Sequence, residues 1–470
     1  MRAATTCGAG RHEPRHARAR RCFGVAVLAY LTVLAGAGLE LGTSAARGPD
    51  GTMSSELIVD GGRSTARTTV EGKATRARDR RNPRAGKRYS VHLARSVEEV
   101  ESLRPAWAAL QGPNFTSDID VFLTVTQTVP GVLRPHVLVV EYAGEPVSLV
   151  AARLEDARLP ARVGYAGFSP RLRMLTVAYG GFLGAGLPDP GVVLDSLGHT
   201  LGEPVDLTRM RMLAVGSPLH AAACDRAGVL RRRRFSPPQR HWHGTIPDSF
   251  DAFLAAQSKE RRRHVRRYQR RLEEAFPGDV EVRTFTTRAE LDLLFADTER
   301  VQRRTYQRAL GVGFSDDELT RRLTELAMDR GWFRGAVLYL RGEPAAFWHG
   351  NAYQGTFSTT VTGYDPALAE RRPGTYLLMK LVEGLCADPS VRMLDFGFGD
   401  ADYKRSFGET STLEEDVVVF EQRPRPLAVN LAESALLGAG ALGHKALGRS
   451  GYATALRRAW RRRLDPSRSA

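Results

Sequence analysis

Cysteine is scarce in this chain of 470 residues. The four cysteines are Cys7, Cys22, Cys224 and Cys386, and no two of them have the paired CxxC spacing of a zinc site. Cysteines this widely separated also do not resemble the disulfide framework of a small secreted protein. The cysteine content therefore predicts no metal site and fits a reducing compartment.

Lysine is scarce too, with 6 lysines against 62 arginines. The formal net charge is +16, but it is concentrated at the two ends of the chain. Residues 1–88 carry a net charge of +10 and residues 449–470 a net charge of +6, which leaves the segment between them neutral. Blocks of one sign usually mark solvated arms, so this charge does not predict a shaped nucleic-acid-binding face.

The N-terminal region contains one long apolar run, residues 22–39, behind several arginines. Its 18 residues are enough for a membrane span or a secretory signal. Alternatively, translation starts at Met53 and leaves this run out of the protein. We interpret residues 1–88 as a disordered basic region, and membrane association through 22–39 stays open.

From Tyr89 onward, segments typical of helices and strands alternate. Apolar residues spaced three and four apart predict one helix over 96–110. Residues 136–155 and 335–353 each read as a strand, a Gly-Glu-Pro turn and a second strand, followed by a further strand, a helix and another strand. This repetition predicts an α/β (α+β) fold of two duplicated units with mixed sheets. The predicted domains are 89–245, 246–425 and a helical or disordered basic tail over 426–470.

Residues 258–276 predict a basic helix with one apolar stripe. Between Lys259 and Arg271 the net charge is +7. One interpretation is an ordinary solvated face. The other is a rim that binds phosphates through Arg262, Arg263 and Arg266.

The stretch LDFGFGDADYKRSFGE, residues 394–409, follows an apolar strand. Ligands in α/β sheets bind beyond the carboxyl ends of strands. Asp395 and Asp400 are candidate proton acceptors there, and Tyr403 and Lys404 begin the next predicted helix. A lysine in so arginine-rich a chain favours a chemical role for Lys404.

A second candidate site precedes the helix that Pro373 opens. Proline costs little in a first helical turn, and free amides at a helix N-terminus bind phosphates. Arg371, Arg372, Gly374 and Thr375 are therefore candidate cofactor-binding residues, although an ordinary capped helix explains the spacing equally well.

His241 and His243 share one face of a predicted strand. No third metal ligand has a suitable spacing, so we interpret them as surface or edge residues.

Several motifs follow one another between residues 259 and 407. They are a Lys-x-Arg-Arg helix, the second hairpin, Gly-Tyr-Asp-Pro with Tyr364 and Asp365, Pro-Gly before a leucine-rich helix, and Asp-Phe-Gly-x-Gly-Asp-x-x-Tyr-Lys. This series resembles the CelD-type or BioF2-like branch of the GNAT acyltransferases, which is related to the FemABX peptidyltransferases. The resemblance implies two tandem GNAT units, the second matched well and the first more loosely.

The resemblance further implies a cleft where the fourth strand, near 356–362, and the fifth strand, near 391–397, splay apart. There an amine would attack the thioester of acyl-CoA, with residues 371–375 on the pyrophosphate. It implies that Tyr403 protonates the leaving thiolate and that Lys404 is directed at substrate phosphates. Tyr376 departs from the family pattern, because it occupies the last glycine position of the phosphate loop.

The predicted function is N-acyl transfer from acyl-CoA, such as acetyl-CoA, to an amine of an amino sugar, amino acid or cell-envelope precursor, as in polysaccharide biosynthesis. The alternatives are an aminoacyl-tRNA-dependent peptidyltransferase and a non-catalytic module that binds anions or nucleic acid. Because acyl-CoA and aminoacyl-tRNA are cytosolic, a cytoplasmic enzyme is expected, with a membrane anchor through 22–39 as the alternative. Apart from tRNA, no nucleic-acid partner is expected.

Overall fold

The computed structural model describes residues 57–58, 67–71, 88–163, 166–184, 189–305 and 313–448. The apolar run 22–39 and the basic end of the chain after Gly448 lie outside the described residues. In the described part of the chain, no helix combines the length and apolarity needed to cross a membrane. Within the region expected to be disordered, β1 (Leu57–Ile58) and β2 (Arg67–Glu71) extend the edge of the sheet.

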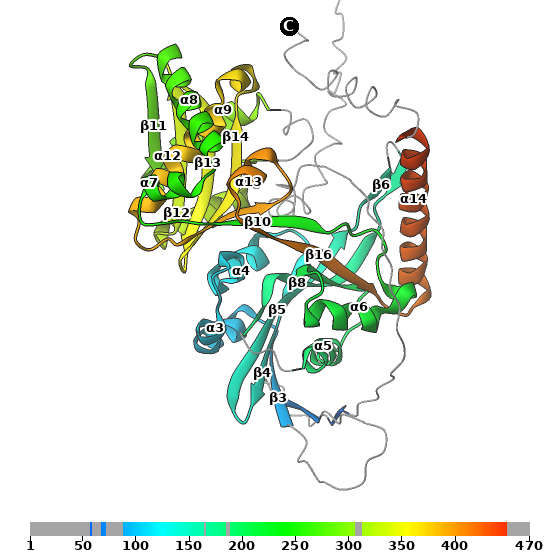
Figure 1. The fold of residues 1–470 in the computed structure, drawn as a ribbon. Helices are drawn as coiled ribbons and strands as arrows, with labels where there is room; N and C mark the ends of the chain where they lie inside the picture. The colour runs from blue at the N-terminus through cyan, green and yellow to red at the C-terminus, as the bar shows by residue number, and fades with distance from the viewer. Residues whose placement is uncertain are drawn as a thin grey trace, which may run out of the picture.

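One 14-stranded sheet runs through the molecule (Figure 1). Its order is β1-β2-β3-β4-β5-β8-β9-β16-β10-β15-β14-β13-β12-β11. The strands of the first unit are β3 (Arg88–Ala94), β4 (Val132–Tyr142), β5 (Glu145–Arg158), β8 (Arg171–Leu183) and β9 (Leu207–Ala214). Those of the second unit are β11 (Val280–Phe285), β12 (Phe333–Leu340), β13 (Glu343–Tyr353), β14 (Thr356–Tyr364) and β15 (Met393–Phe398). A separate two-stranded sheet pairs β6 (Ala161–Val163) with β7 (Ala166–Phe168).

The two units exchange strands at the centre of the large sheet. Strand β10 (Gln239–Thr245) follows the first unit in the chain but pairs with β15 of the second. Strand β16 (Thr410–Phe420) follows the second unit but pairs with β9 of the first, and β10 and β16 also pair with each other. The sheet order therefore reads nearly the same from both ends, which confirms the mixed α/β class with tandem units. The boundary between residues 245 and 246 stays a prediction, since the sheet continues across it.

Each unit contains one parallel strand pair that is joined only over a short stretch. Strands β8 and β9 pair from Met174–Leu207 to Val177–Met210. Strands β14 and β15 pair over three positions, from Thr356–Met393 to Ser358–Asp395. Beyond these positions the two strands of each pair are no longer paired with each other, so each unit has a splayed junction.

The two predicted hairpins are confirmed. Both turns have two residues with positive φ, Ala143 and Gly144 in one and Arg341 and Gly342 in the other. Turns of this kind match the right-handed twist of the strands that they join. The predicted helix over 96–110 is instead two helices, α2 (Val97–Ser102) and α3 (Arg104–Leu110). Pro105 explains the break, because a proline fits the first turn of a new helix but not a helix interior.

Helices cover both faces of the sheet. In the first unit these are α2, α3, η2 (Phe115–Ser117), α4 (Ile119–Thr128), α5 (Pro190–His199) and α6 (Pro218–Arg231). In the second unit they are α7 (Phe250–Ala256), α8 (Lys259–Ala275), η3 (Arg288–Glu290), α9 (Leu291–Gln302), α11 (Glu318–Asp329), η4 (Pro366–Arg371), α12 (Pro373–Ala387) and α13 (Asp402–Phe407). Helix α14 (Pro424–Gly448) covers the first part of the predicted tail.

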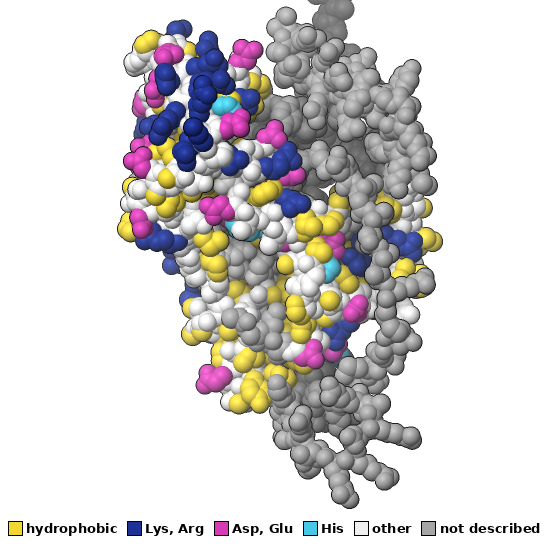
Figure 2. All heavy atoms as spheres, in the orientation of Figure 1, with side chains coloured by type: hydrophobic (Ala, Val, Ile, Leu, Met, Phe, Trp, Pro, Cys, Tyr) yellow, Lys and Arg dark blue, Asp and Glu magenta, His cyan; other side chains and the backbone are white. Residues whose placement is uncertain are grey.

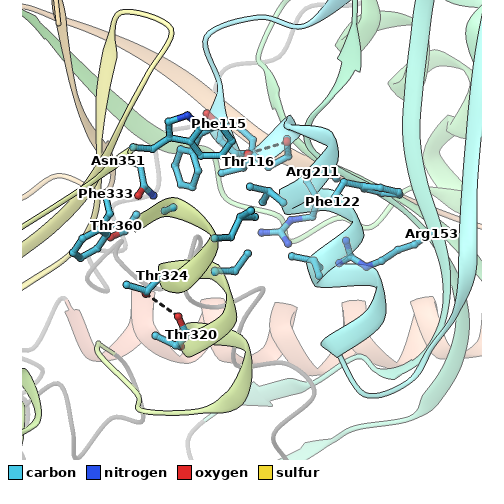
Figure 3. A pocket seen from close by; sticks show the side chains of 18 residues that line it. Phe115, Thr116, Phe122, Arg153, Arg211, Thr320, Thr324, Phe333, Asn351 and Thr360 are labelled. Atoms are coloured by element: carbon cyan, nitrogen blue, oxygen red, sulfur yellow. Dashed lines mark hydrogen bonds between the residues drawn. The ribbon is translucent and has the colours of Figure 1, made fainter. Parts of the chain in front are cut away.

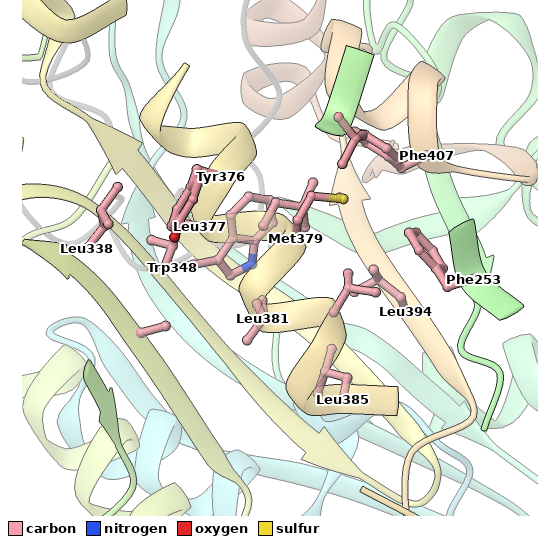
Figure 4. Close-up of a cluster of buried hydrophobic side chains, with 14 of the residues drawn as sticks. Phe253, Leu338, Trp348, Tyr376, Leu377, Met379, Leu381, Leu385, Leu394 and Phe407 are labelled. Atoms are coloured by element: carbon pink, nitrogen blue, oxygen red, sulfur yellow. The ribbon is translucent and has the colours of Figure 1, made fainter. Parts of the chain in front are cut away.

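Helix α12 carries much of the core of the second unit (Figure 4). Leu377, Met379 and Val382 are fully buried between this helix and the sheet, and Trp348 of β13 packs in the same cluster. A separate cluster under α9 and α11 includes Phe295 and lies on the opposite face of the same strands. Both faces of β13 and β14 are therefore buried, and side chains on alternate residues reach different compartments.

Candidate active site

A bulge at the end of β15 places Asp395 beside His241 of β10. Gly397 has φ +72°, and the pairing of β10 with β15 shifts register at this point. The extra residue in such a bulge changes which side chains share a face. Asp395 and Phe398 consequently both lie next to His241, while Phe396 stays in the core under α12.

His241 lies between two carboxylates. Its Nε2 is 2.6 Å from Oδ1 of Asp395, and its Nδ1 is 2.9 Å from Oε1 of Glu414 on β16. Only 3% of His241 is exposed. A ring that faces a carboxylate oxygen on both sides is best satisfied as an imidazolium that donates from both nitrogens.

The electrostatics of this cluster follow from these contacts. Burial acts to lower the pKa of His241, but the hydrogen bonds that it donates to Asp395 and Glu414 outweigh burial and raise the pKa to about 9. Burial acts to raise the pKa of Asp395, but the bond to His241 outweighs it, so the carboxyl pKa lies below its usual value. The neighbouring His243 has a lowered pKa because of burial and the charge on His241. With two carboxylates and one imidazolium, the Asp395–His241–Glu414 cluster has a net charge of −1.

Two hydroxyl groups connect the cluster to its surroundings. Ser358 Oγ donates to Oδ2 of Asp395 at 3.3 Å, and Tyr179 Oη lies 3.3 Å from Nδ1 of His241. Ser358 is also the last residue of β14 that pairs with β15. The carboxylate of Asp395 therefore sits at the point where the parallel pair separates.

Lys404 reaches the same point from α13. Its side chain is 2% exposed, and its Nζ donates to the backbone oxygen of Phe398 at 2.5 Å. A Cβ added to Gly397 would lie 3.9 Å from Nζ of Lys404 and 3.7 Å from the backbone oxygen of Thr359. Burial lowers the pKa of Lys404 to about 8, against the opposing attraction of Asp395. The ammonium thus points into the protein at the splayed junction, not outward to a substrate phosphate.

Tyr403 and Asp400 have different surroundings. The ring of Tyr403 packs against Trp348 and Phe396, and burial raises its phenol pKa. Asp400 is exposed and forms an ion pair with Arg405 at 2.8 Å. Of the four candidate catalytic residues, the structure therefore brings Asp395, Tyr403 and Lys404 to the junction and leaves Asp400 at the surface.

The candidate phosphate site lies at the first turn of α12. Arg372 is its N-cap residue, has a left-handed backbone with φ +55°, and provides no side-chain cap. Its guanidinium stacks over the ring of Tyr268 on α8, 5.7 Å from the centroid. A Cβ on Gly374 would lie 3.3 Å from the ring of Tyr364, so glycine lets that exposed tyrosine approach the helix. Arg371 is exposed and Thr375 is half-buried nearby.

Helix α8 runs alongside this turn. Figure 2 shows lysine and arginine side chains gathered over it. Arg263 and Arg266 are exposed, whereas Arg262 donates to the backbone oxygens of Ala255 and Gln257 at 2.8 and 2.7 Å. Arg262 therefore joins α7 to α8, and the outer arginines remain available to an anion.

Asp365 has a local structural role. Its carboxylate caps η4 by accepting from Ala367 N at 2.9 Å and pairs with Arg304 at 2.8 Å. It is 7% exposed. The aspartate of the Gly-Tyr-Asp-Pro motif thus fixes the loop that carries Tyr364 and Arg371.

Two groups of side chains among the described residues have metal-ligand spacing. The first is His241, His243 and Asp395, so β15 supplies a third group beside the two histidines. A protonated His241 bonded to two carboxylates offers no lone pair to a metal. The second is His220, Cys224 and Glu415, where Arg232 donates to the same Glu415 oxygen that faces His220, at 2.6 Å. A guanidinium at that position opposes a cation, and neither group is assigned as a metal site.

His241 is the residue that sequence reasoning missed. It was expected at a surface or edge, yet it is buried at the centre of the sheet. Its two partners are 154 and 173 residues away in sequence. The sequence did contain one signal for this site. The strand that ends the first unit carries two histidines separated by a tryptophan.

Comparison with known proteins classifies most of the second unit. Residues 259–405 match the family model of the acetyltransferase (GNAT) domain. No curated protein matches the sequence significantly. The CelD-type or BioF2-like branch remains an expectation.

Solved structures resemble the chain more broadly. A crystal structure of FemX has a TM-score of 0.47 at 10% identity, over 70% of this chain and 98% of that one. A conserved protein of unknown function from Bacteroides thetaiotaomicron has a TM-score of 0.43 at 11% identity, over 69% and 97%. A tandem GNAT protein from the clavulanic acid biosynthesis pathway has a TM-score of 0.41 at 13% identity, over 70% and 98%.

Proposed function

We propose that the protein is an N-acyltransferase that moves an acyl group from acyl-CoA to an amine, with the chemistry at the β14–β15 junction of its GNAT-type domain. One observation carries the proposal. The two parallel strands separate after Ser358 and Asp395, and the buried Lys404 lies near enough to feel the charge of the Asp395 carboxylate there. Perturbed ionisable groups gathered at one strand end are typical of catalytic sites.

The acceptor side of the reaction depends on Asp395. The net negative Asp395–His241–Glu414 cluster attracts a protonated amine, which loses one proton to solvent before the neutral amine attacks. Once the amine nitrogen bonds to the thioester carbonyl carbon, its N–H becomes acidic enough for a carboxylate to accept the proton. Oδ2 of Asp395 is the oxygen that faces away from His241, and we assign it this role. Beyond Ser358, backbone N–H groups on the free edge of β14 stabilise the oxyanion.

The donor side depends on Lys404. As the C–N bond forms and the C–S bond breaks, the sulfur leaves as a thiolate that needs a proton. The pKa of Lys404, about 8, lies close to that of an ordinary thiol, about 8.5. Such matching favours proton transfer, so Lys404 is the proposed donor, and Tyr403 is the alternative. Solvent then returns a proton to Lys404 and removes one from Asp395.

The phosphates of the donor are proposed to lie at the first turn of α12, on Arg371, Arg372, Gly374 and Thr375. The positive end of the helix dipole and the uncapped turn favour an anion there. The exposed arginines of α8, Arg263 and Arg266, continue the same basic surface.

This basic surface also favours a second candidate donor, an aminoacyl-tRNA. RNA would contact α8 through several phosphates, and its binding would weaken steeply with salt. A transfer that proceeds with aminoacyl-tRNA but not with acyl-CoA would establish this alternative.

The direct test is thiol release from acetyl-CoA by the full chain with a panel of amino sugars, amino acids and alkyl amines, with mass spectrometry of the amide. Lys404→Met is expected to lower kcat about a hundredfold or more, and Tyr403→Phe less. Arg405→Met, an exposed neighbour on the same helix, is the control. Release that does not depend on an amine, or equal rates for Lys404→Met and Arg405→Met, would refute the assignment.

The acceptor class and the cellular location follow as proposals. An amino sugar, an amino acid or a cell-envelope precursor would present the required amine. Since acyl-CoA is a cytosolic metabolite, the proposed reaction places the catalytic unit in the cytoplasm.

A further inference from the structure

A cavity of about 90 Å³ lies between α4 of the first unit and α11 of the second (Figure 3). Phe122 and Leu323 line it from the two helices. Its other wall is the sheet, which contributes Arg153, Asn351 and Thr360. The cavity therefore combines apolar helices on one side with polar groups on the other.

Polar contacts fix the two helices relative to each other. Tyr353 Oη donates to Asp118, the N-cap of α4, at 2.9 Å. Arg330 at the end of α11 pairs with Asp120 of α4. Both contacts are made at the N-terminal end of α4 and hold it against β13 and α11 of the second unit.

Asn351 provides the first sign of a ligand. The residue is 6% exposed, and its Oδ1 has no hydrogen-bond partner among the described residues. A buried acceptor without a donor destabilises the fold. A ligand that donates an N–H at this position would satisfy it.

The position of Asn351 connects the cavity to the proposed reaction. Asn351 is directly opposite Ser358 in the pairing of β13 with β14, and side chains paired in this way share a face. Ser358 in turn donates to Asp395. The unsatisfied oxygen therefore lies on the same face of the sheet as the carboxylate proposed to accept the amine proton, two strands away with Ser358 of β14 between them.

The opposite end of the cavity has a net charge of +1, because three guanidiniums, Arg153, Arg209 and Arg211, are paired with only two carboxylates, Glu155 and Asp416. Arg153 and Arg211 line it, and they are 3% and 5% exposed. Arg153 also donates to Glu155, and Arg211 to Asp416, through Nε. Figure 3 shows these two side chains on the α4 side, with Asn351 and Thr360 across the cavity from them. A guanidinium pair at this place fits a carboxylate.

We propose that this cavity binds the acyl acceptor and that the acceptor is a small α-amino acid, an inference that rests on the proposed N-acyltransferase activity. The amine lies near Asn351, the carboxylate faces Arg153 and Arg211, and an aliphatic side chain packs against α4 and α11. The volume supports a compact ligand, since it is smaller than the cavity of about 150 Å³ that holds benzene.

The first test compares amines that differ only in the carboxylate. L-alanine and L-valine are assayed against ethylamine and isobutylamine, which lack it, and against glucosamine. The amino acids are expected to have at least tenfold higher kcat/KM in acetyl-CoA-dependent thiol release. Equal or higher values for the amines without a carboxylate, or for glucosamine, would overturn the inference.

The second test changes the cavity. Asn351→Leu removes the unsatisfied oxygen, and Ala327→Leu fills space from α11. Both are expected to raise the KM for L-alanine at least tenfold and to leave the KM for acetyl-CoA unchanged. Asn351→Leu is further expected not to lower the melting temperature, because no hydrogen bond to Oδ1 is lost. Ala296→Leu on the exposed face of α9 is the matched control.

Binding of L-alanine and L-valine to the full chain without acyl-CoA, measured by calorimetry, separates the two proposals. If acetyl-CoA is never consumed but Ala327→Leu abolishes amino-acid binding, the reaction is wrong and the cavity assignment stands. If transfer occurs but neither cavity variant changes the amine KM, the cavity assignment is wrong and the reaction stands. Absence of both transfer and binding would refute both.

Discussion

The two units begin their corresponding helices, α5 and α12, with opposite charges. Helix α5 has Asp189 at its N-cap, and the carboxylate accepts from Gly191 N at 2.9 Å. Helix α12 has Arg372 at the same position and no side-chain cap. The carboxylate of Asp189 satisfies an amide and repels a phosphate. Arg372 accepts from the N–H groups of Thr375 and Tyr376 through its backbone oxygen only, and its cationic side chain attracts a phosphate. The difference supports the proposal that the donor binds to the second unit.

The splayed junctions of the two units also differ in how completely their charged groups are paired. In the first unit, Asp416 of β16 is held by Arg209 and Arg211 of β9 and by the backbone N–H of Met212. Burial acts to raise the pKa of Asp416, but the two arginines lower it to about 2. In the second unit, the bulge at Gly397 leaves Asp395 and Lys404 without so complete a set of ion pairs. This difference supports the proposal that the first junction is held by ion pairs and that the second is the reactive one.

The largest expected effect is on catalysis at the second junction. Asp395→Asn removes the proposed proton acceptor and is expected to lower kcat about 10²- to 10⁴-fold in the thiol-release assay. Asp402→Asn, which changes an exposed carboxylate on α13, is the control. Equal activity of the two variants would show that Asp395 is not the proton acceptor, and the proposed difference between the two junctions would then be wrong.

The next effect concerns stability at the first junction. Asp416→Asn leaves the buried Arg211 and the half-buried Arg209 without their carboxylate and is expected to lower the free energy of unfolding by about 3–5 kcal/mol. Asp400→Asn breaks an exposed pair with Arg405 and should cost less than about 1 kcal/mol. Urea unfolding measures both. A small loss for Asp416→Asn would contradict the view that charge locks the first unit.

The pH dependence of stability tests His241. Its folded pKa, about 9, lies above the ordinary value of 6.5, so the imidazolium stabilises the fold fully below pH 6.5. This contribution is lost as pH rises through 9. One pKa unit corresponds to about 1.36 kcal/mol, so the loss is on the order of 3 kcal/mol.

Lys404 changes the stability in the opposite direction. Its pKa is lowered from 10.5 to about 8, so burial of its ammonium destabilises the fold below pH 8, and this cost decreases as the pH rises above 8. The measurement therefore compares the unfolding free energies of wild type and His241→Gln between pH 6 and 10, each in a Lys404→Met background. Parallel curves would contradict a raised pKa. The other groups that face His241 are Asp395, Glu414, His243 and Tyr179.

The smallest effects are expected at the helix N-termini. Arg372→Asp gives α12 the charge that α5 has and is expected to raise the KM for acyl-CoA about tenfold with kcat retained. Asp189→Ala removes the cap of α5 and should cost about 1 kcal/mol of stability with no change in that KM. A higher donor KM in Asp189→Ala would reverse the assignment of the donor to the second unit.

Local patterns predicted much of the fold. The Gly-Glu-Pro turns, the apolar stripe of α8 and the proline at the start of α12 are all specified by residues close in sequence, and the structure contains the expected elements. The break between α2 and α3 was missed although Pro105 signals it.

The candidate site was predictable only in part. Asp395 and Lys404 were identified because one lies near the end of a strand and the other near the start of a helix, which are local features. The inward direction of the Lys404 side chain and the burial of His241 depend on the exchange of β10 and β16, and no periodicity within a strand reveals which distant strand lies beside it. The unsatisfied oxygen of Asn351 is likewise visible only when both units are in place.

Strand exchange also has a consequence for how the chain can be divided. A cut after Thr245 would leave each fragment holding one strand that belongs beside the other fragment's parallel pair. Neither piece is then expected to be stable alone, but the two expressed together should reassemble through β10 and β16. Each half would then need the other in order to fold, and recovery of activity when the two are mixed would measure their assembly.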